Sequence, residues 1–435
     1  AVNPVIYVSP LTSASLPTGT KIGLPDFTGT LPNLDPTQAN GDSLDFLPRK
    51  SLAQPYIQNW SAGFQYQFPH EVLLEANYVG SKGTRLLDSN FSNFFNQVNS
   101  KFMALGDNIN MDFQDALNEG ILAPYNITQL PYPSFEDGNN CGTSLQYGLA
   151  PYPQYCGLTN NYPTMGKSSY HALQVTARKN STHGLTFIAA YAFSKTLSDT
   201  DTALYYPSYY VQDFYNRKLE KSITGFDHPH SLKLTWIYSL PFGRGQKYLN
   251  SGGMLNRLVS GWQITAIQQY LSGDPLVVSS SLGTVINPHL RADIVSGVSQ
   301  RVAPQGLNAV LNYDPDTGAV TNGTAWLNSA AFVDPPSSPD NGYPLRIGTS
   351  PRYLPNVRGP GHESEDLGII KNTRINERFN FQIRADMFNV FNRTGLGNPD
   401  TSLGDGLPAD GGTFGLIQTP MNGARVVQFA LRLNF

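Results

Sequence analysis

Residues 378–388 read RFNFQIRADMF, and their strict alternation of polar and apolar side chains decides the fold. A period of two predicts a β-strand, because successive side chains point to opposite faces. The apolar face would cover a core in a soluble protein, whereas in a membrane barrel it would meet lipid while the polar face lined the lumen. The two faces carry Phe379, Phe381, Ile383, Ala385 and Met387 on one side and Arg378, Asn380, Gln382, Arg384 and Asp386 on the other.

The end of the chain, ARVVQFALRLNF at 424–435, repeats this pattern. One face carries Val427, Phe429, Leu431, Leu433 and Phe435, and the other carries Gln428, Arg432 and Asn434. Seven further stretches alternate in the same way, although the last two are weaker. They lie at 56–68, 72–79, 170–179, 184–193, 231–240, 261–270 and 365–375. We therefore predict nine strands.

The connections between these strands alternate between short and long. Tight turns are expected at 69–71, 180–184 and 375–377, with a turn of middle length at 241–253. Long loops are expected at 81–168, 197–228, 273–364 and 392–423. Short periplasmic turns and long extracellular loops are typical of outer-membrane barrels, whereas loops this long are unusual in a compact soluble domain. The pattern predicts an all-β, antiparallel transmembrane barrel, of which about 9–11 strands lie in this chain.

Composition narrows the function classes. The net charge is −3 and 14% of residues are charged, which argues against a nucleic-acid partner because such a partner needs a basic surface. The 40 Gly, 32 Pro, 23 Tyr and 23 Phe suit an all-β protein with long connections. The sequence has no run of about 18 apolar residues, so it predicts no transmembrane helix. Three hypotheses stay open: a transporter barrel, a structural or adhesive surface barrel, and a soluble secreted β-sandwich.

The strand count suggests that the chain is one part of a barrel. Bacterial single-chain barrels have even strand numbers, and nine is odd. We interpret residues 1–54 as the remnant of an extracellular loop and residues 55–435 as the C-terminal part of a barrel. The last strand would then pair with a strand that lies outside this sequence, unless a segment such as PLVVSSS at 275–281 supplies a hidden strand.

Cys141 and Cys156 are the two cysteines of the chain, and both lie in one polar, proline-rich loop. An even pair in an exported protein predicts a disulfide, with two free thiols as the alternative. Such a bond requires a Cα separation below about 7 Å.

Several blocks carry a resemblance to a known family. They include YIQNWSAGFQYQFPHEVLLEANYVG from residue 56, SSYHALQVTARKNSTHGLTFIAAYAFSKTLSD from 168, GFDHPHSLKLTWIYSLPFGRGQ from 225 and LGIIKNTRINERFNFQIRADMFNVFNRTGLGNPD from 367. Their order resembles the barrel end of Oar-like TonB-dependent outer-membrane receptors. The resemblance implies a 22-stranded barrel, an N-terminal plug, an upstream carboxypeptidase-regulatory-like domain and energised uptake through the TonB complex. It also implies that the barrel-assembly machinery reads the terminal Phe435.

The polar face of the predicted strands supplies candidate functional residues. Charge facing lipid costs about 2–4 kcal/mol, so charged side chains on strands should point into the lumen. We interpret them as a network of ion pairs and hydrogen bonds in preference to a ligand site. The predicted lumen-facing residues are Glu75, Arg378, Gln382, Arg384, Asp386, Gln428 and Arg432, and the predicted lipid-facing residues are Phe379, Phe381, Ile383, Phe429, Leu431 and Leu433.

Other candidate sites are weaker. FDHPH at 226–230 supplies Asp227, His228 and His230, which could begin a metal site but fit a loop-to-strand corner better. Clustered tyrosines in the loop 203–216 suit stacking on a sugar or peptide, or packing between loops. They include Tyr205, Tyr206, Tyr209 and Tyr210. No residue pattern predicts an enzyme or a cofactor.

Overall fold

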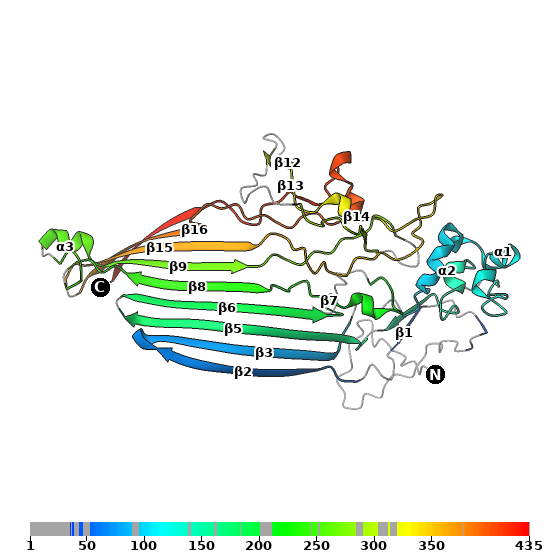
Figure 1. Ribbon diagram of the computed structural model, residues 1–435, viewed down its shortest axis with the longest axis horizontal. Coiled ribbons are helices and arrows are strands. Elements are labelled where there is room, and N and C mark those ends of the chain that lie inside the picture. The colour runs from blue at the N-terminus through cyan, green and yellow to red at the C-terminus, as the bar shows by residue number, and fades with distance from the viewer. Residues whose placement is uncertain are drawn as a thin grey trace, which may run out of the picture.

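The computed structural model describes residues 35, 37–38, 43–46, 53–88, 95–137, 141–160, 163–182, 184–200, 211–243, 245–250, 253–283, 290–302, 312–313, 320–376 and 378–434. Nine long antiparallel strands form one sheet, in the order β18-β16-β15-β9-β8-β6-β5-β3-β2 (Figure 1). All nine strands predicted from the alternation are confirmed. Their bounds are β2 Tyr56–Phe68, β3 Val72–Leu86, β5 Gly166–Thr182, β6 Leu185–Ser198, β8 His230–Ser239, β9 Trp262–Leu271, β15 His362–Arg374, β16 Asn380–Phe388 and β18 Val426–Asn434.

Smaller elements lie in the connections. The short strands are β1 Ser43–Phe46, β4 Gly157–Asn160, β7 Ser222–Ile223, β10 Asp293–Ile294, β11 Asn312–Tyr313, β12 Val320–Asn322, β13 Thr324–Ala325, β14 Phe332–Val333 and β17 Leu416–Ile417. The α-helices are α1 Phe113–Asn118, α2 Leu145–Gly148 and α3 Gly253–Val259. Short 3-10 helices lie at Pro69–Glu71, Ser100–Asn110, Ala123–Tyr125, Arg217–Glu220, Ser329–Ala331, Leu403–Asp405 and Pro408–Asp410. Among the described residues, no helix combines the length and the apolar character needed to cross a membrane.

The register of the sheet is staggered in one direction. A single row of paired residues starts at Phe68, the last residue of β2, and ends at Val427, the second residue of β18. The row therefore runs from the short-turn end of the sheet to the opposite end. Its members are Phe68, Val72, Lys179, Phe187, Trp236, Ala266, Leu367, Met387 and Val427. A stagger that accumulates in this way is the shear of strands tilted around a barrel axis.

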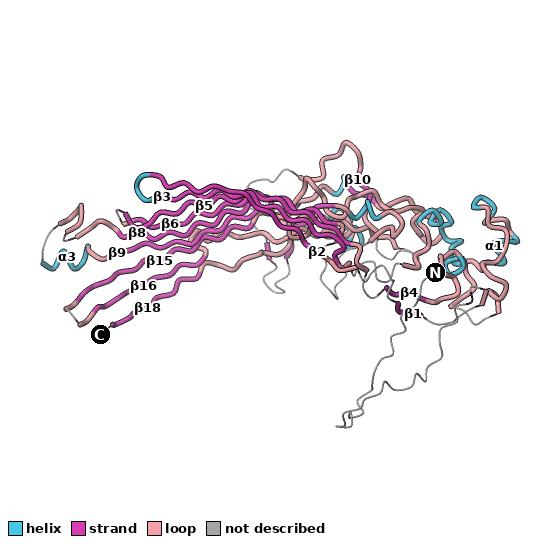
Figure 2. The backbone as a smooth tube through the Cα atoms, turned by 90° about the horizontal axis from the view of Figure 1, so that it is seen from below, coloured by secondary structure: helices cyan, strands magenta, loops and turns pink. Residues whose placement is uncertain are grey.

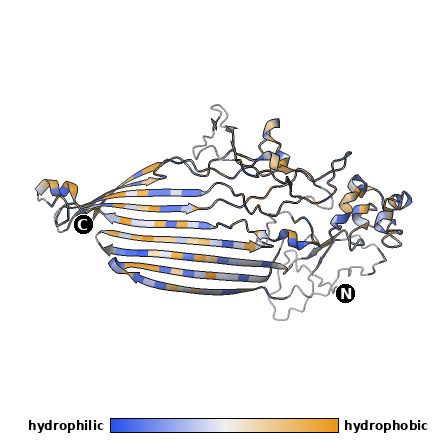
Figure 3. Cartoon of the chain, viewed as in Figure 1, coloured by the Kyte–Doolittle hydropathy of each residue, from blue (hydrophilic) through white to orange (hydrophobic). Residues whose placement is uncertain are grey.

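The same register separates the sheet into two faces. We call the face with the parity of Phe381 and Phe429 the apolar face and the opposite one the polar face, and the alternation is visible as colour blocks along the strands in Figure 3. Phe429 and Leu431 are 76% and 71% exposed, so no second sheet within the described part of the chain packs against them. The sandwich hypothesis is therefore wrong, since a sandwich buries one face of each sheet.

The sheet is open, and its two edges are β2 and β18. Within the described residues β18 pairs with β16 alone, and β2 pairs with β3 alone. The expected hidden strand at 275–281 is wrong: Pro275 and Ser279 make isolated bridges, while Leu276 and Val278 are buried between loops. Removing these apolar side chains from water stabilises the segment among the loops.

The four long connections gather at one end of the sheet, and the short ones, with α3, gather at the other (Figures 1 and 2). We call the described residues of 87–165, 199–229, 272–361 and 389–425 the cap. The predicted loops 81–168, 197–228, 273–364 and 392–423 mostly coincide with it, but β3 continues to Leu86 and β5 begins at Gly166. Of the proposed loop remnant 1–54, β1 is described, and it pairs in parallel with β4 of the cap.

Candidate functional site: the cap and the polar face

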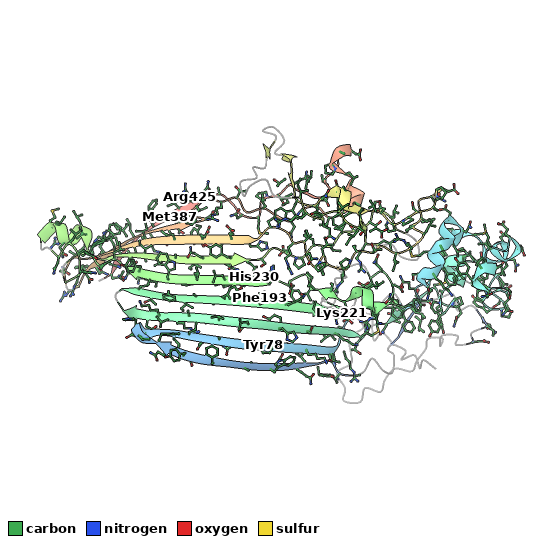
Figure 4. The ribbon with its side chains drawn as sticks, viewed as in Figure 1. Tyr78, Phe193, Lys221, His230, Met387 and Arg425 are labelled. Atoms are coloured by element: carbon green, nitrogen blue, oxygen red, sulfur yellow. A yellow bond between two sulfur atoms is a disulfide. The ribbon has the colours of Figure 1, made fainter. Side chains whose placement is uncertain are left out.

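The cap is a packed structure with its own hydrophobic clusters. The first connection forms one cluster around Phe113, Phe135 and Leu145, each at most 1% exposed. The third and fourth connections form another cluster. In it the rings of Phe332 and Phe414 pack edge to face, with their centroids 5.8 Å apart. Each such buried side chain stabilises its surroundings by about 1.5–3 kcal/mol. Figure 4 shows that side chains crowd together at this end of the molecule.

A disulfide closes part of the first connection. Cys141 and Cys156 are bonded, with Cα atoms 5.0 Å apart, inside the limit of about 7 Å given above. The bond joins the segment before α2 to the segment before β4, and therefore ties the first hydrophobic cluster to the parallel pair of β4 and β1.

A buried ion pair ties the second connection to the third. Arg291 donates to Glu220 at 2.8 Å, and both side chains are 1% exposed. The same guanidinium donates to the carbonyl oxygens of Ser350 at 3.1 Å and Leu219 at 3.3 Å. Gln212 bridges the same two connections, since its side chain donates to the carbonyl of Gly348 at 3.1 Å. Charges this deeply buried require such partners.

The base of the cap is fixed to the strand ends by a second set of charges. Arg217 lies 3.3 Å from Asp88, just after β3, and 3.3 Å from Asp199, just after β6. It also donates to the carbonyl of Met165, immediately before β5. Burial of Asp88 raises the pKa of its carboxyl to about 7, although the charge of Arg217 opposes this shift.

The Asp-His-Pro-His segment forms the corner that leads into β8. Asp227 pairs with Arg358 at 2.5 Å, and the ring of His228 bonds the carbonyl of Ser272 at 2.7 Å. His230 lies on the apolar face beside Phe193, with ring centroids 5.1 Å apart (Figure 4). Across the described residues no three His, Cys, Asp or Glu side chains are arranged to hold a metal ion. The contacts of Asp227 and His228 place the segment at the corner where the second connection enters β8.

Asp274 lies beside two of the histidines at this corner. Its carboxylate is 3.1 Å from the ring of His362 and 3.7 Å from that of His228. Burial opposes ionisation, but hydrogen bonds from Asn398 and His362 outweigh it and lower the pKa of Asp274. This cluster joins the second, third and fourth connections.

Several side chains on the polar face pair with one another. Gln65 donates to Glu75 across β2 and β3 at 2.9 Å, and Arg384 pairs with Asp386 at 2.7 Å. Gln382 donates to Asn372 at 2.8 Å. The register places Gln382 opposite Arg432 and Asp386 opposite Gln428, while Arg378 and Phe379 lie just before β16. That this face lines a lumen, and the other meets lipid, stays a prediction.

Sequence reasoning missed an apolar patch on the polar face. Ile188, Ile237 and Ile267, all exposed, lie on the neighbouring strands β6, β8 and β9. Ile188 and Ile267 both pair with Thr235, two residues before Ile237, so Ile237 is a diagonal neighbour of each, while Thr235 lies between the other two. The signal was present in the sequence, since each isoleucine interrupts the polar parity of its strand.

A groove of about 590 Å³ opens in the outer part of the cap. It lies between α1 and the segment 128–133, and Gln114, Asn118 and Tyr132 contribute to its wall. The candidate ligand residues Tyr205, Tyr206, Tyr209 and Tyr210 lie outside the described residues, and so does Phe435.

Comparison with known proteins places the chain in a family. Residues 3–428 match the family described as outer membrane beta barrel domain. The chain belongs to this family. Its fold is the antiparallel sheet of an outer-membrane β-barrel, and its location is the outer membrane.

Two solved structures are similar to this barrel domain at low identity. One is the outer membrane transporter YddB from Escherichia coli, at 9% identity and TM-score 0.39, over 90% of this chain and 34% of that one. The other is the ferric-catecholate import receptor Fiu from E. coli K12, at 11% identity and TM-score 0.33, over 87% of this chain and 27% of that one. The chain thus spans about a third or less of either protein's length. No curated protein matches the sequence.

Proposed function

We propose that this chain forms part of the barrel of a TonB-dependent, Oar-like receptor that imports a substrate across the outer membrane. The apolar face meets lipid, the polar face lines the lumen, and the cap lies outside the cell. The protein is a transporter and not an enzyme. Substrate is first held by the cap and then passes into the lumen.

The open edges support a barrel wider than these nine strands. Unpaired backbone groups in hydrocarbon cost several kcal/mol each, so β2 and β18 need partners in a membrane. We place those partners in strands of the same barrel that lie outside the described residues. A barrel of eight strands is just filled by its own side chains, and a much wider one needs water or a plug inside.

The patch of Ile188, Ile237 and Ile267 is the observation that carries the proposal. Three exposed isoleucines on a lumen wall favour contact with a folded body over contact with water. The remaining polar side chains of this wall, Glu75 and Asp386 among them, would pair with that body or with each other. A plug seated in the lumen is the arrangement that energised uptake requires, and a simple adhesive barrel has no need of one.

The packed cap supports a role in binding. The buried ion pair of Arg291 and Glu220 fixes two of its connections to each other, so the cap presents a defined surface. The groove beside α1 opens on that surface. Binding sites are commonly carried on loops that a rigid scaffold positions. The groove is therefore our first candidate for substrate capture.

The experiment replaces Ile237 by Glu in the full-length protein and measures leakage of vancomycin, which intact outer membranes exclude. A loosened plug should raise sensitivity, while Gln382→Glu, on the polar face outside the patch, should not. Deleting the gene and inactivating the TonB system should each impair growth on the same nutrient. A strain that carries both changes should grow no worse than the strain without the TonB system. Unchanged leakage together with an adhesion defect and no nutrient phenotype would favour the structural barrel instead.

A further inference from the structure

The connection between β8 and β9 has features that a simple turn does not need. It spans residues 240–261 and carries α3, at the end of the sheet opposite the cap (Figure 1). The helix leaves three large apolar side chains exposed. Met254 is 81%, Leu255 is 53% and Leu258 is 62% exposed. Side chains of this kind at the end of a barrel call for an apolar partner.

Beside α3 lies an apolar groove of about 540 Å³. Its walls are Leu240, Phe242, Leu249, Leu258, Val259, Trp262, Ile264 and Ile369. The indole N–H of Trp262 donates to the carbonyl of Leu258 at 2.8 Å, so its polar atom is already satisfied. The groove consequently offers hydrocarbon contacts and no polar recognition inside it.

The groove is continuous with the apolar face of the sheet. Trp262, Ile264 and Ile369 have the parity of that face, because Ile264 pairs with Ile369 and Ile369 pairs with Ala385. They lie on β9 and β15, in the middle of the sheet and away from its open edges. An occupant therefore enters from the side on which the proposed function places lipid.

A buried lysine holds the helix in this position. Lys371, on the apolar face of β15, donates to the carbonyl of Arg257 at 2.8 Å and to that of Ser260, both at the end of α3. Its ammonium also lies 5.5 Å from the ring centroid of Trp262. A cation at the end of a helix satisfies carbonyls that the helix leaves unpaired. These contacts fix α3 against β15 and so hold the walls of the groove in place.

The charge of the segment indicates what the groove holds. Residues 240–262 contain Arg244, Lys247 and Arg257 and no aspartate or glutamate. The next short connection adds Arg374 and Arg378 against a single Glu377. An apolar helix surface with basic residues and no acidic ones is typical of segments that lie in a membrane interface and attract anionic lipid.

We propose that the groove beside α3, with the described residues 245–250 and 253–259, forms a binding site for an anionic glycerophospholipid of the periplasmic leaflet. One acyl chain lies in the groove, and Lys247 and Arg257 attract the phosphate of the headgroup. The inference rests on the proposed orientation of the barrel and adds a lipid site to it. Each basic residue near a membrane surface enriches anionic lipid by up to roughly fivefold.

The test uses the full-length protein in vesicles of phosphatidylcholine with and without phosphatidylglycerol. A fluorophore is attached at Leu255→Cys, which is exposed and does not line the groove, and nitroxide-labelled acyl chains of each lipid serve as quenchers. We expect quenching by the phosphatidylglycerol probe to exceed that by the phosphatidylcholine probe severalfold. Neutralising Lys247 and Arg257 with glutamine should remove most of this preference.

Two label positions separate this inference from the proposed orientation. A fluorophore at Phe429→Cys, on the apolar face of β18, should be quenched by both lipids in every variant. If Phe429 is quenched and Leu255 is not, another occupant covers α3 and the lipid site is wrong. Equal quenching of Leu255 by both lipids would also overturn it. If Phe429 itself escapes quenching, the orientation of the barrel is wrong.

Discussion

Replacing Arg291 by methionine should loosen the cap while leaving the sheet intact. The substitution removes the 2.8 Å ion pair with Glu220 and the two hydrogen bonds to the carbonyls of Ser350 and Leu219. Methionine has about the length of the arginine stem, so the main loss is electrostatic. It leaves the Glu220 carboxylate, 1% exposed, without its cation. Breaking a buried pair in this way costs about 3–5 kcal/mol.

This cost can be measured as local opening of the cap. A loss of about 3–5 kcal/mol raises the opening constant by roughly two to three and a half orders of magnitude. Hydrogen exchange of the full-length protein in detergent should therefore show faster exchange at cap amides near Gln212 and Ser350. Amides of β15 and β16 should keep their protection, because the ladder of the sheet does not depend on Arg291.

Two comparisons make the result interpretable. Arg346→Met removes an ion pair with Asp293 in the same cap, but the Arg346 side chain is 46% exposed and the backbone N–H of Thr349 still donates to Asp293, so the expected loss is smaller than for Arg291→Met. The double variant Glu220→Leu with Arg291→Met should recover part of the stability, because it leaves no buried charge unpaired. An Arg291→Met protein whose cap exchanges as slowly as the wild type would refute the reasoning.

Three further predictions concern the disulfide, a buried acid and the two faces. Reducing the disulfide, or replacing it through Cys141→Ser with Cys156→Ser, should lower the stability of the first connection by about 3 kcal/mol. Proteolysis of the cap should then be faster, and that of the sheet unchanged. The pKa of Asp88 in the folded protein, about 7, lies above its ordinary value of 3.8. Ionised Asp88 therefore destabilises the cap above pH 7, and protonation relieves this as the pH falls toward 4. Asp88→Asn should remove this pH dependence of hydrogen exchange in the cap, which amounts to at most about 4 kcal/mol. Ile383→Arg should destabilise the barrel in lipid vesicles by about 2–4 kcal/mol in urea titrations, and Gln382→Arg should change it little; equal losses at both positions would contradict the assignment of the faces.

The strands could be predicted because their signal is local and periodic. In β16 the alternation from Phe381 to Met387 survives without interruption, and the pleat of a strand converts it directly into two faces. A tight turn such as Pro69–Glu71 also limits the register of the two strands it joins, whereas the long connections place no such limit on the pairs that they join. The disulfide was predictable for a different reason, since two cysteines in one loop have a single pairing.

The cap could not be predicted because its contacts are long-range. Phe113 and Phe332 are buried at irregular spacing in the sequence, and no periodicity marks them as core. Arg291 and Glu220 are far apart in the chain, and nothing local pairs them. Leu276 and Val278 illustrate the converse error, since an apolar run with strand character is buried by loops and contributes no strand to the sheet.

The most direct test of the account is an accessibility scan along β18 in the full-length protein in its membrane. Single spin labels would be placed in turn at 427–433, and collisions with oxygen, which enters lipid, would be compared with collisions with a water-soluble nickel chelate. We predict oxygen accessibility at Phe429, Leu431 and Leu433, with lower values at Gln428 and Arg432, in a period of two. A scan with no such period, or with Gln428 and Arg432 the lipid-accessible positions, would contradict the claim that this sheet is the wall of an outer-membrane barrel.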